Sequence, residues 1–118
     1  MKYTRMYATA DGESHFEDVE VDLSSGAGGT VSEVLKASGM MFRRTAPDYD
    51  VSWHPAPQRY FIINVEGSVE LQVSDGEKRI FGPGSIVLAE DTTGKGHISR
   101  AVGGKERLSV FVNVPKET

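Results

Sequence analysis

The amino-acid sequence predicts an all-β protein made of one domain. Three observations support this: apolar and polar residues alternate in steps of two, the longest apolar runs are short and rich in β-branched residues, and Gly, Pro and Asp-Gly signals separate them. A chain of 118 residues fits one domain spanning residues 1–118, since domains commonly hold roughly 100–150 residues. No repeat or low-complexity tract divides the sequence.

The first third of the chain predicts one strand, one loop and one short helix. Residues 19–23 alternate Val or Leu with Glu or Asp, which is typical of a strand with one buried face. The glycine-rich stretch 24–30 predicts a flexible loop. Residues 30–38 have helical character, because Thr30 and Glu33 have the spacing of a capping box and a glycine follows the segment.

The rest of the chain predicts a series of strands joined by tight turns. The run 61–65 is the most hydrophobic and is short, which favours a strand over a helix. The segment 69–73 alternates, and the Asp75-Gly76 pair after it predicts a hairpin turn. Further strands are predicted at 80–81, at 85–89 and at 108–114, the middle one apolar on both faces.

Composition and charge exclude several classes of protein. The chain has no cysteine, which excludes disulfides, thiolate metal sites and thiol nucleophiles. Its net charge of −4 argues against a nucleic-acid partner, which needs clustered Lys and Arg. No signal-peptide pattern and no apolar run of membrane-spanning length occurs. We therefore expect a cytoplasmic protein that binds neither nucleic acid nor membrane.

Residues 50–104 carry a more specific pattern, in which strand-like segments are separated in turn by Gly67, Asp75-Gly76 and Gly82-Pro83-Gly84. This order resembles a small single-domain cupin, whose motifs are G-x5-H-x-H-x3-4-E-x6-G and G-x5-P-x-G-x2-H-x3-N. The resemblance implies a single cupin-type antiparallel β-barrel, or jelly roll. It also implies a divalent metal held by three His and one Glu, and a homodimer.

The metal positions of that family are only partly kept. By the spacing of the first motif, His54 and Ala56 take the two histidine positions and Tyr60 takes that of the glutamate. In the second motif, Lys95 stands at the histidine position by strict spacing, and His97 fits if the turn is two residues longer. The resemblance thus leaves either no metal or a weakly held Fe, Mn, Ni or Zn ion on His54 and His97.

The substituted positions still predict a polar cavity. Gln58, Tyr60, Ile62 and Asn64 share the pleat face of His54 in a regular strand. Histidine acts as a general base near neutral pH, and tyrosine donates to a developing oxyanion, so His54, His97 and Tyr60 are the candidate catalytic residues. The alternatives are that the histidines are polar groups at a wet barrel mouth and that the Tyr60 ring only fills the core.

Arginines offer a further ligand-binding group. Arg43, Arg44 and Arg59 could each recognise a carboxylate, although most arginines are solvated surface charges. Arg59, next to Tyr60, joins Gln58, Ile62 and Asn64 in the predicted ligand-binding set.

These residues support several hypotheses about function. The first is an enzyme that acts on a small organic metabolite by isomerase, cyclase or lyase chemistry. The alternatives are a non-catalytic metabolite-binding or sensing protein, a metal-dependent oxygenase with a non-standard ligand set, and a structural or storage protein. Residues 61, 63 and 65 face away from Tyr60, so we expect them to pack on a second sheet or on a second copy in a homodimer.

Overall fold

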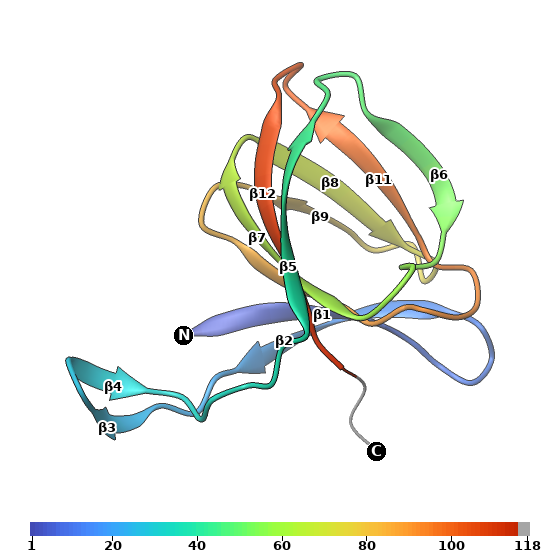
Figure 1. The fold of residues 1–118 in the computed structure, drawn as a ribbon. Coiled ribbons are helices and arrows are strands. Elements are labelled where there is room, and N and C mark those ends of the chain that lie inside the picture. Colours follow the sequence, from blue (N-terminus) through green and yellow to red (C-terminus); the bar gives the residue numbers. More distant parts are fainter. Residues whose placement is uncertain (116–118) are drawn as a thin grey trace.

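β-strands form all the regular secondary structure of residues 1–115, the part of the chain that this computed structural model describes (Figure 1). No helix occurs in that part, so none there could cross a membrane. The prediction of an all-β protein is confirmed at this level.

The strands form two main sheets and one separate hairpin. The six-stranded sheet has the spatial order β2 (Ser14–Glu20), β1 (Lys2–Ala8), β10 (Ile86–Ala89), β7 (Tyr60–Glu66), β12 (Arg107–Asn113) and β5 (Gly39–Thr45). The four-stranded sheet has the order β6 (Asp50–His54), β11 (His97–Val102), β8 (Ser68–Val73) and β9 (Lys78–Phe81). The hairpin consists of β3 (Ser24–Gly26) and β4 (Gly29–Val31) and projects from the body of the molecule (Figure 1).

Most neighbouring strands are antiparallel, but β1 runs parallel to β10, with Arg5 opposite Leu88. This pair departs from the predicted wholly antiparallel arrangement. Parallel strands need a long crossover connection, and here the connection is most of the chain between β1 and β10. The first strand thereby lies beside a strand from the second half of the sequence.

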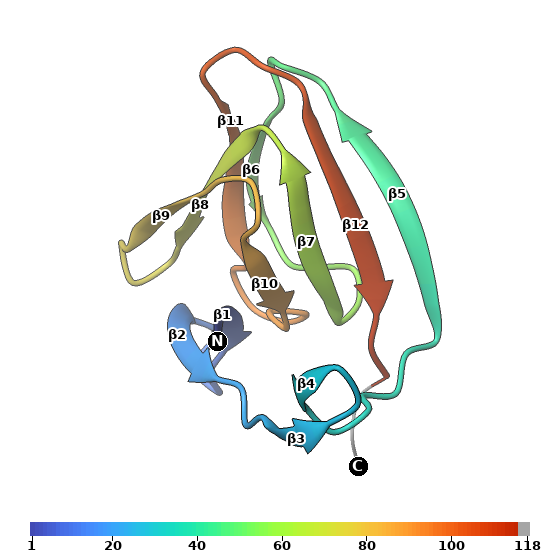
Figure 2. The ribbon, with the colours of Figure 1, turned by 90° about the vertical axis from the view of Figure 1, so that its left-hand side faces the viewer.

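The hydrophobic core lies between the two sheets, which face each other in Figure 2. In β8 the buried residues are every second one, so one face of the strand supplies Val69, Leu71 and Val73 to the core. The opposite sheet contributes Met6, Phe16, Val87 and Ala89, and Phe81 comes from β9. The strands predicted at 61–65, 69–73, 80–81, 85–89 and 108–114 are confirmed as β7, β8, β9, β10 and β12.

The segment 19–38 differs from the prediction. Strand β2 ends at Glu20, the predicted loop 24–30 is the β3–β4 hairpin, and the predicted helix at 30–38 does not form. Val34 is 99% exposed, so the apolar side of such a helix would have nothing to pack against. A helix of that length is marginal in water without tertiary packing. The extended backbone instead pairs Ser25 with Thr30 across a turn at Ala27 and Gly28.

Candidate functional site

A small cavity of about 40 Å³ lies in the interior between the two sheets. Its walls combine apolar core residues with a few polar and charged side chains, which is the usual composition of a small-molecule site. The polar and aromatic members are Arg43, Tyr49, His54, Tyr60, Asn64, Ser85, His97, Ser99, Arg107, Phe81 and Phe111. The aliphatic members are Ile62, Val69, Leu71 and Val87.

Two histidines meet at one wall of this cavity. His54 ends β6, His97 begins β11, and the two residues stand opposite each other in the sheet. Their ring centroids are 4.4 Å apart and their planes are inclined by 55°. His97 is buried, whereas His54 is partly exposed. The structure therefore brings together the two histidines that the sequence analysis selected.

The approach of these strands depends on Gly96. This residue has φ +72°, a conformation that L side chains rarely adopt, and it is buried against the backbone of His54. The proline after His54 ends β6 there. The backbone N–H of Ala56 then donates to the carbonyl oxygen of Asp91, which ties the segment after His54 to the loop before His97.

Each imidazole is oriented by a hydrogen bond at Nδ1. The fully buried Asp91 carboxylate lies 2.5 Å from Nδ1 of His97, which donates to it. Nδ1 of His54 donates to the carbonyl oxygen of Ser52 at 2.7 Å, because a carbonyl can only accept. A neutral imidazole with a proton on Nδ1 has a basic Nε2. Both rings therefore keep Nε2 for a ligand or a proton.

Tyr60, Ile62 and Asn64, which alternate along β7, all line the cavity as predicted. The Tyr60 ring packs edge-on against Phe111, with centroids 4.9 Å apart. Burial raises the pKa of the Tyr60 phenol, so the hydroxyl stays protonated at neutral pH and acts as a donor. Buried Asn64 donates to the carbonyl oxygens of Gly67 and Phe81, and this leaves its Oδ1 without a partner among the described residues.

Gln58 and Arg59 do not reach this cavity. Gln58 is exposed in the β6–β7 connection. Arg59 donates to Glu90, with Nε 2.5 Å from Oε2, and Arg5 donates to the other oxygen of the same carboxylate. Burial opposes the charge on Glu90, but the hydrogen bonds from both arginines outweigh it and hold the pKa of that carboxyl below its usual value. Arg59 is therefore engaged in a structural ion-pair network.

The arginines that do line the cavity are Arg43 and Arg107. Arg43 was one of three candidates, whereas exposed Arg44 pairs with Glu106 on the surface. Arg107 was not predicted. The alternation of side chains along β12 could have identified it, because Arg107 shares the inward face of that strand with the buried Ser109 and Phe111.

The donor set does not fit a tightly held divalent metal. Such sites generally use three or more protein ligands, and no cluster of three His, Cys, Asp or Glu suited to a metal occurs among residues 1–115. His54 and His97 supply two imidazoles, and Oδ2 of Asp91 is hydrogen-bonded to His97 while its buried Oδ1 has no partner among the described residues. Tyr60, which stands where the motif that the sequence resembles has a glutamate, supplies no carboxylate ligand.

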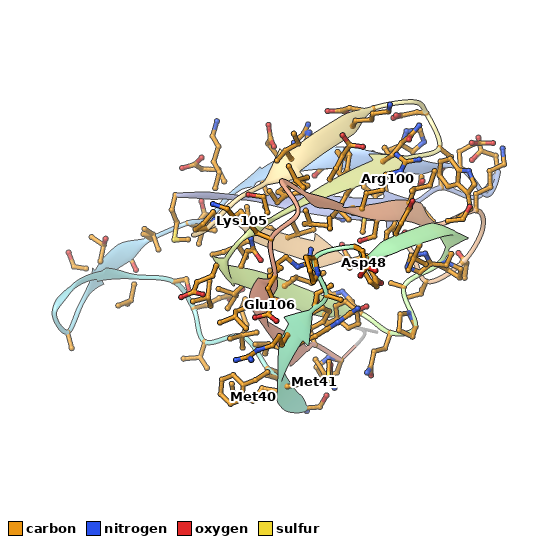
Figure 3. The ribbon with its side chains drawn as sticks, turned by 90° about the horizontal axis from the view of Figure 1, so that it is seen from above. Met40, Met41, Asp48, Arg100, Lys105 and Glu106 are labelled. Atoms are coloured by element: carbon orange, nitrogen blue, oxygen red, sulfur yellow. The ribbon has the colours of Figure 1, made fainter. Side chains whose placement is uncertain are left out.

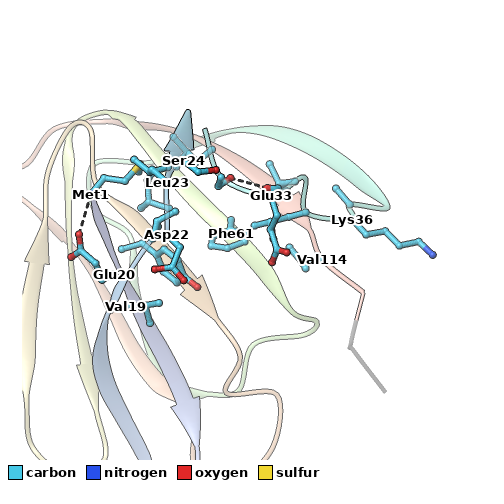
Figure 4. A pocket seen from close by; sticks show the side chains of 18 residues that line it. Met1, Val19, Glu20, Asp22, Leu23, Ser24, Glu33, Lys36, Phe61 and Val114 are labelled. Atoms are coloured by element: carbon cyan, nitrogen blue, oxygen red, sulfur yellow. Dashed lines mark hydrogen bonds and ion pairs between the residues drawn. The ribbon is translucent and has the colours of Figure 1, made fainter. Parts of the chain in front are cut away.

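A second hollow, a groove of about 730 Å³, lies on the outer side of the six-stranded sheet (Figure 4). Phe61 and Ile63 of β7 line one wall, and residues of the segment 19–37 line the other. Figure 4 shows Phe61 between Asp22 and Val114. Nearby, Met40 lies exposed on β5, an edge strand of the sheet, on the same face as the exposed Phe42 (Figure 3). This side of the molecule therefore presents a large apolar surface.

Comparison with known proteins supports the fold and adds nothing on chemistry. No model of a protein family matches the sequence, and no curated protein matches it either. Among solved structures, protein NMB1881 from Neisseria meningitidis is similar, with a TM-score of 0.51 and 14% sequence identity. The match covers 81% of this chain and 84% of that one. At this identity the likeness concerns the fold alone.

Proposed function

We propose that the chain is a cupin-type small-molecule-binding protein and an enzyme that moves a proton on a small organic metabolite, as isomerases, cyclases and lyases do. The observation that carries this proposal is the pair of imidazoles 4.4 Å apart in one cavity, each with Nδ1 engaged. Each Nε2 can accept a hydrogen bond or a proton from the same ligand, and a ring that has taken a proton can return it. The jelly-roll barrel itself belongs to the proposal and rests on the motif order in residues 50–104.

The arrangement assigns different roles to the two histidines. His97 is the base, because the Asp91 carboxylate stabilises the imidazolium that forms when Nε2 takes a proton. The imidazolium of His97 then returns this proton from Nε2 to a second atom of the ligand, while Nε2 of the partly exposed His54 accepts a hydrogen bond from a ligand hydroxyl. Tyr60 donates a hydrogen bond to the oxyanion that develops when a proton leaves the carbon beside a carbonyl group. The net reaction is a shift of one proton within the ligand.

Solvent exchange tests this role directly. Small 2-oxo and 2-hydroxy acids and aldehydes are incubated with the protein in D₂O, and incorporation of deuterium beside the carbonyl is followed by NMR. We expect exchange with the wild type and its loss in His97→Gln. Asp91→Asn should slow exchange by about 10²–10⁴-fold, the scale seen when a histidine loses its orienting carboxylate. Exchange that persists unchanged in His97→Gln would overturn the assignment.

A non-catalytic binding or sensing protein is the second candidate. The small volume of the cavity favours it, since a site of about 40 Å³ leaves little room for a reacting substrate to change shape. Saturable binding of a ligand without deuterium exchange would identify this function. An oxygenase would need a fuller set of metal ligands than two imidazoles. Any Fe, Mn, Ni or Zn ion on these imidazoles would be weakly held.

We also propose that the protein forms a homodimer through its outer apolar face. Phe42 is 79% exposed on edge strand β5, and Val65 is 52% exposed on β7 of the same sheet. Exposed edge strands and contiguous apolar surface are usually covered by another chain. A second copy of this chain would cover both. We also propose a cytoplasmic location, as expected from the sequence.

A further inference from the structure

Arg107 is a buried arginine without an ion-pair partner among the described residues. Arg107 is only 6% exposed, and its Nε makes no hydrogen bond within the described part of the chain. No carboxylate of residues 1–115 lies within ion-pair distance of it. Arginines are almost never buried unless they are paired, because removing a charge from water without compensation is costly. The side chain lines the interior cavity.

Arg107 is the centre of a cluster of unsatisfied polar groups. Thr45 on β5 stands directly opposite Arg107, and its buried Oγ1 has no partner among the described residues. Ser109, two positions along β12, stands opposite Asn64 on β7, and Ser109 Oγ and Asn64 Oδ1 are also unpartnered there. Three neighbouring strands thus carry four such residues on one face of the sheet, and of these Arg107 and Asn64 line the cavity. Hydroxyl and guanidinium groups supply donors, and the amide oxygen supplies one acceptor.

A second positive charge, that of Arg43, lies on the same face of the sheet as Arg107. Arg43 stands opposite Ser109, so it is the diagonal neighbour of Arg107 on the same face of the sheet, and it also lines the cavity. Its guanidinium lies over the rings of Tyr49 and Phe111, at 5.1 and 5.4 Å from their centroids. Burial, and then the charge of Arg43, lower the pKa of Arg107. An anion between the two guanidinium groups would relieve this repulsion.

The planar guanidinium groups and the small volume of the cavity favour a small carboxylate as the bound anion. A planar guanidinium binds a planar carboxylate through two parallel hydrogen bonds. The cavity volume of about 40 Å³ restricts the ligand to few carbon atoms. Asn64 Oδ1 is an acceptor, so it favours a ligand with a hydroxyl beside the carboxylate and disfavours a dianion such as phosphate.

We propose that Arg107, assisted by Arg43, binds the carboxylate of a small organic acid, preferably a hydroxy acid, inside the cavity. Carboxylate binding by Arg107 and Arg43 does not depend on the proposed function. Only the orientation of the rest of the acid toward His54 and His97 rests on that function. Both sets of residues line the same cavity.

Calorimetry or NMR titration with acetate, glycolate, lactate and inorganic phosphate tests the proposal. We expect saturable binding of the carboxylates, with glycolate or lactate tighter than acetate, and weaker binding of phosphate. Arg107→Leu should weaken carboxylate binding by roughly tenfold or more, the scale for a hydrogen bond to a charged group. Arg44→Leu is the matched control, since exposed Arg44 pairs with Glu106 outside the cavity, and it should bind as the wild type does.

Two further measurements keep the test decisive. Arg107→Leu should retain the unfolding temperature of the ligand-free wild type, because it removes an unpaired buried charge; if it fails to fold, Arg43→Leu takes its place in the titration. The double variant His54→Gln/His97→Gln should keep carboxylate binding while it loses deuterium exchange, which separates failure of this proposal from failure of the proposed function. Unaltered carboxylate binding in the arginine variant, no carboxylate binding by the wild type, or tighter binding of phosphate would each overturn the proposal.

Discussion

A Cβ atom placed on Gly96 would lie 2.0 Å from the carbonyl oxygen of His54, a separation that real atoms do not reach. The glycine lets the start of β11 approach the end of β6, and this contact brings the two imidazoles to a centroid separation of 4.4 Å with tilted planes. A residue outside the cavity lining therefore controls the spacing of the two candidate catalytic groups.

Gly96→Ala should be severely destabilising. It combines a left-handed backbone, which costs about 1–2 kcal/mol for a residue with a Cβ, with an overlap against backbone that cannot move aside. We expect a total loss above about 3 kcal/mol in the free energy of unfolding, measured by urea titration. Gly103→Ala is the control, because Gly103 has φ +76° and open space around its Cβ position. Equal losses for the two variants would show that the close approach contributes nothing.

Tyr60→Phe should leave the fold nearly intact, since the ring keeps its contact with Phe111 and loses one hydroxyl. If the hydroxyl contacts a ligand, carboxylate binding or exchange should weaken by about 1 kcal/mol or more. Tyr60→Ala should instead cost about 3–5 kcal/mol of stability by opening a cavity in the core. Identical ligand affinity for the wild type and the Phe variant would assign Tyr60 to packing alone.

Glu90 makes stability depend on pH in the acid range. Its pKa is lower in the folded protein than the ordinary value of 4.5, so folding favours the charged form. The resulting stabilisation is complete above about pH 4.5 and is lost as the pH falls through the folded pKa. Glu90→Gln should therefore cost about 1–3 kcal/mol at pH 7, and its difference from the wild type should shrink below pH 4.5.

Urea titrations at several pH values measure that difference. The control is Glu106→Gln, which removes an exposed pair with Arg44 at 3.6 Å and should cost less than about 1 kcal/mol. A Glu90→Gln penalty that is independent of pH would mean that packing, and not charge, accounts for the role of Glu90.

Any divalent metal on His54 and His97 should be lost easily. Two neutral imidazoles lack the negative charge of a carboxylate ligand, and the Asp91 carboxylate is already hydrogen-bonded to His97. Protein dialysed against a chelator should contain well under one metal ion per chain by elemental analysis, with its unfolding temperature unchanged. Stoichiometric metal after this treatment would contradict the prediction and would identify a further ligand.

The proposed homodimer predicts a particular response to charge. The wild type should have twice the mass of the chain by light scattering, and Phe42→Glu should shift it toward monomer, because a charge on the exposed face of edge strand β5 opposes burial. Ile80→Glu is the control: Ile80 is 62% exposed, on β9 of the other sheet. A wild type that is monomeric at all concentrations would refute the dimer.

Most strands in the second half of the fold were predictable, β8 above all because it keeps a simple period, but β11 was not predicted. Val69, Leu71 and Val73 alternate with polar residues, and all three are buried. Strand β1 escaped prediction because its inward positions include Thr4 beside Met6, so hydrophobicity does not mark the buried face. The wrong helix at 30–38 shows the limit of local signals, since capping residues do not stabilise a helix that packs on nothing.

The residues of the candidate site could be predicted from the sequence only in part. His54 and His97 were selected by the spacing of the motifs that the sequence resembles, which needs no structure. Their orientation by Asp91 and by the Ser52 carbonyl depends on contacts that spacing does not encode. Arg107 was missed because arginine is usually a surface residue, and its burial emerges only when three strands are placed side by side.

The parallel pairing of β1 with β10 also determines the order in which the protein can assemble. The hydrogen bonds on one edge of β1 cannot form until residues 87–89, more than two thirds of the chain away, have been synthesised. During translation the β1–β2 hairpin can close early, but buried Met6 gains its neighbours in β10 only near the end. Contacts between residues so far apart in sequence slow folding, because the loop between them must close first. The apolar face of the β1–β2 hairpin therefore stays uncovered until the chain has been synthesised as far as β10.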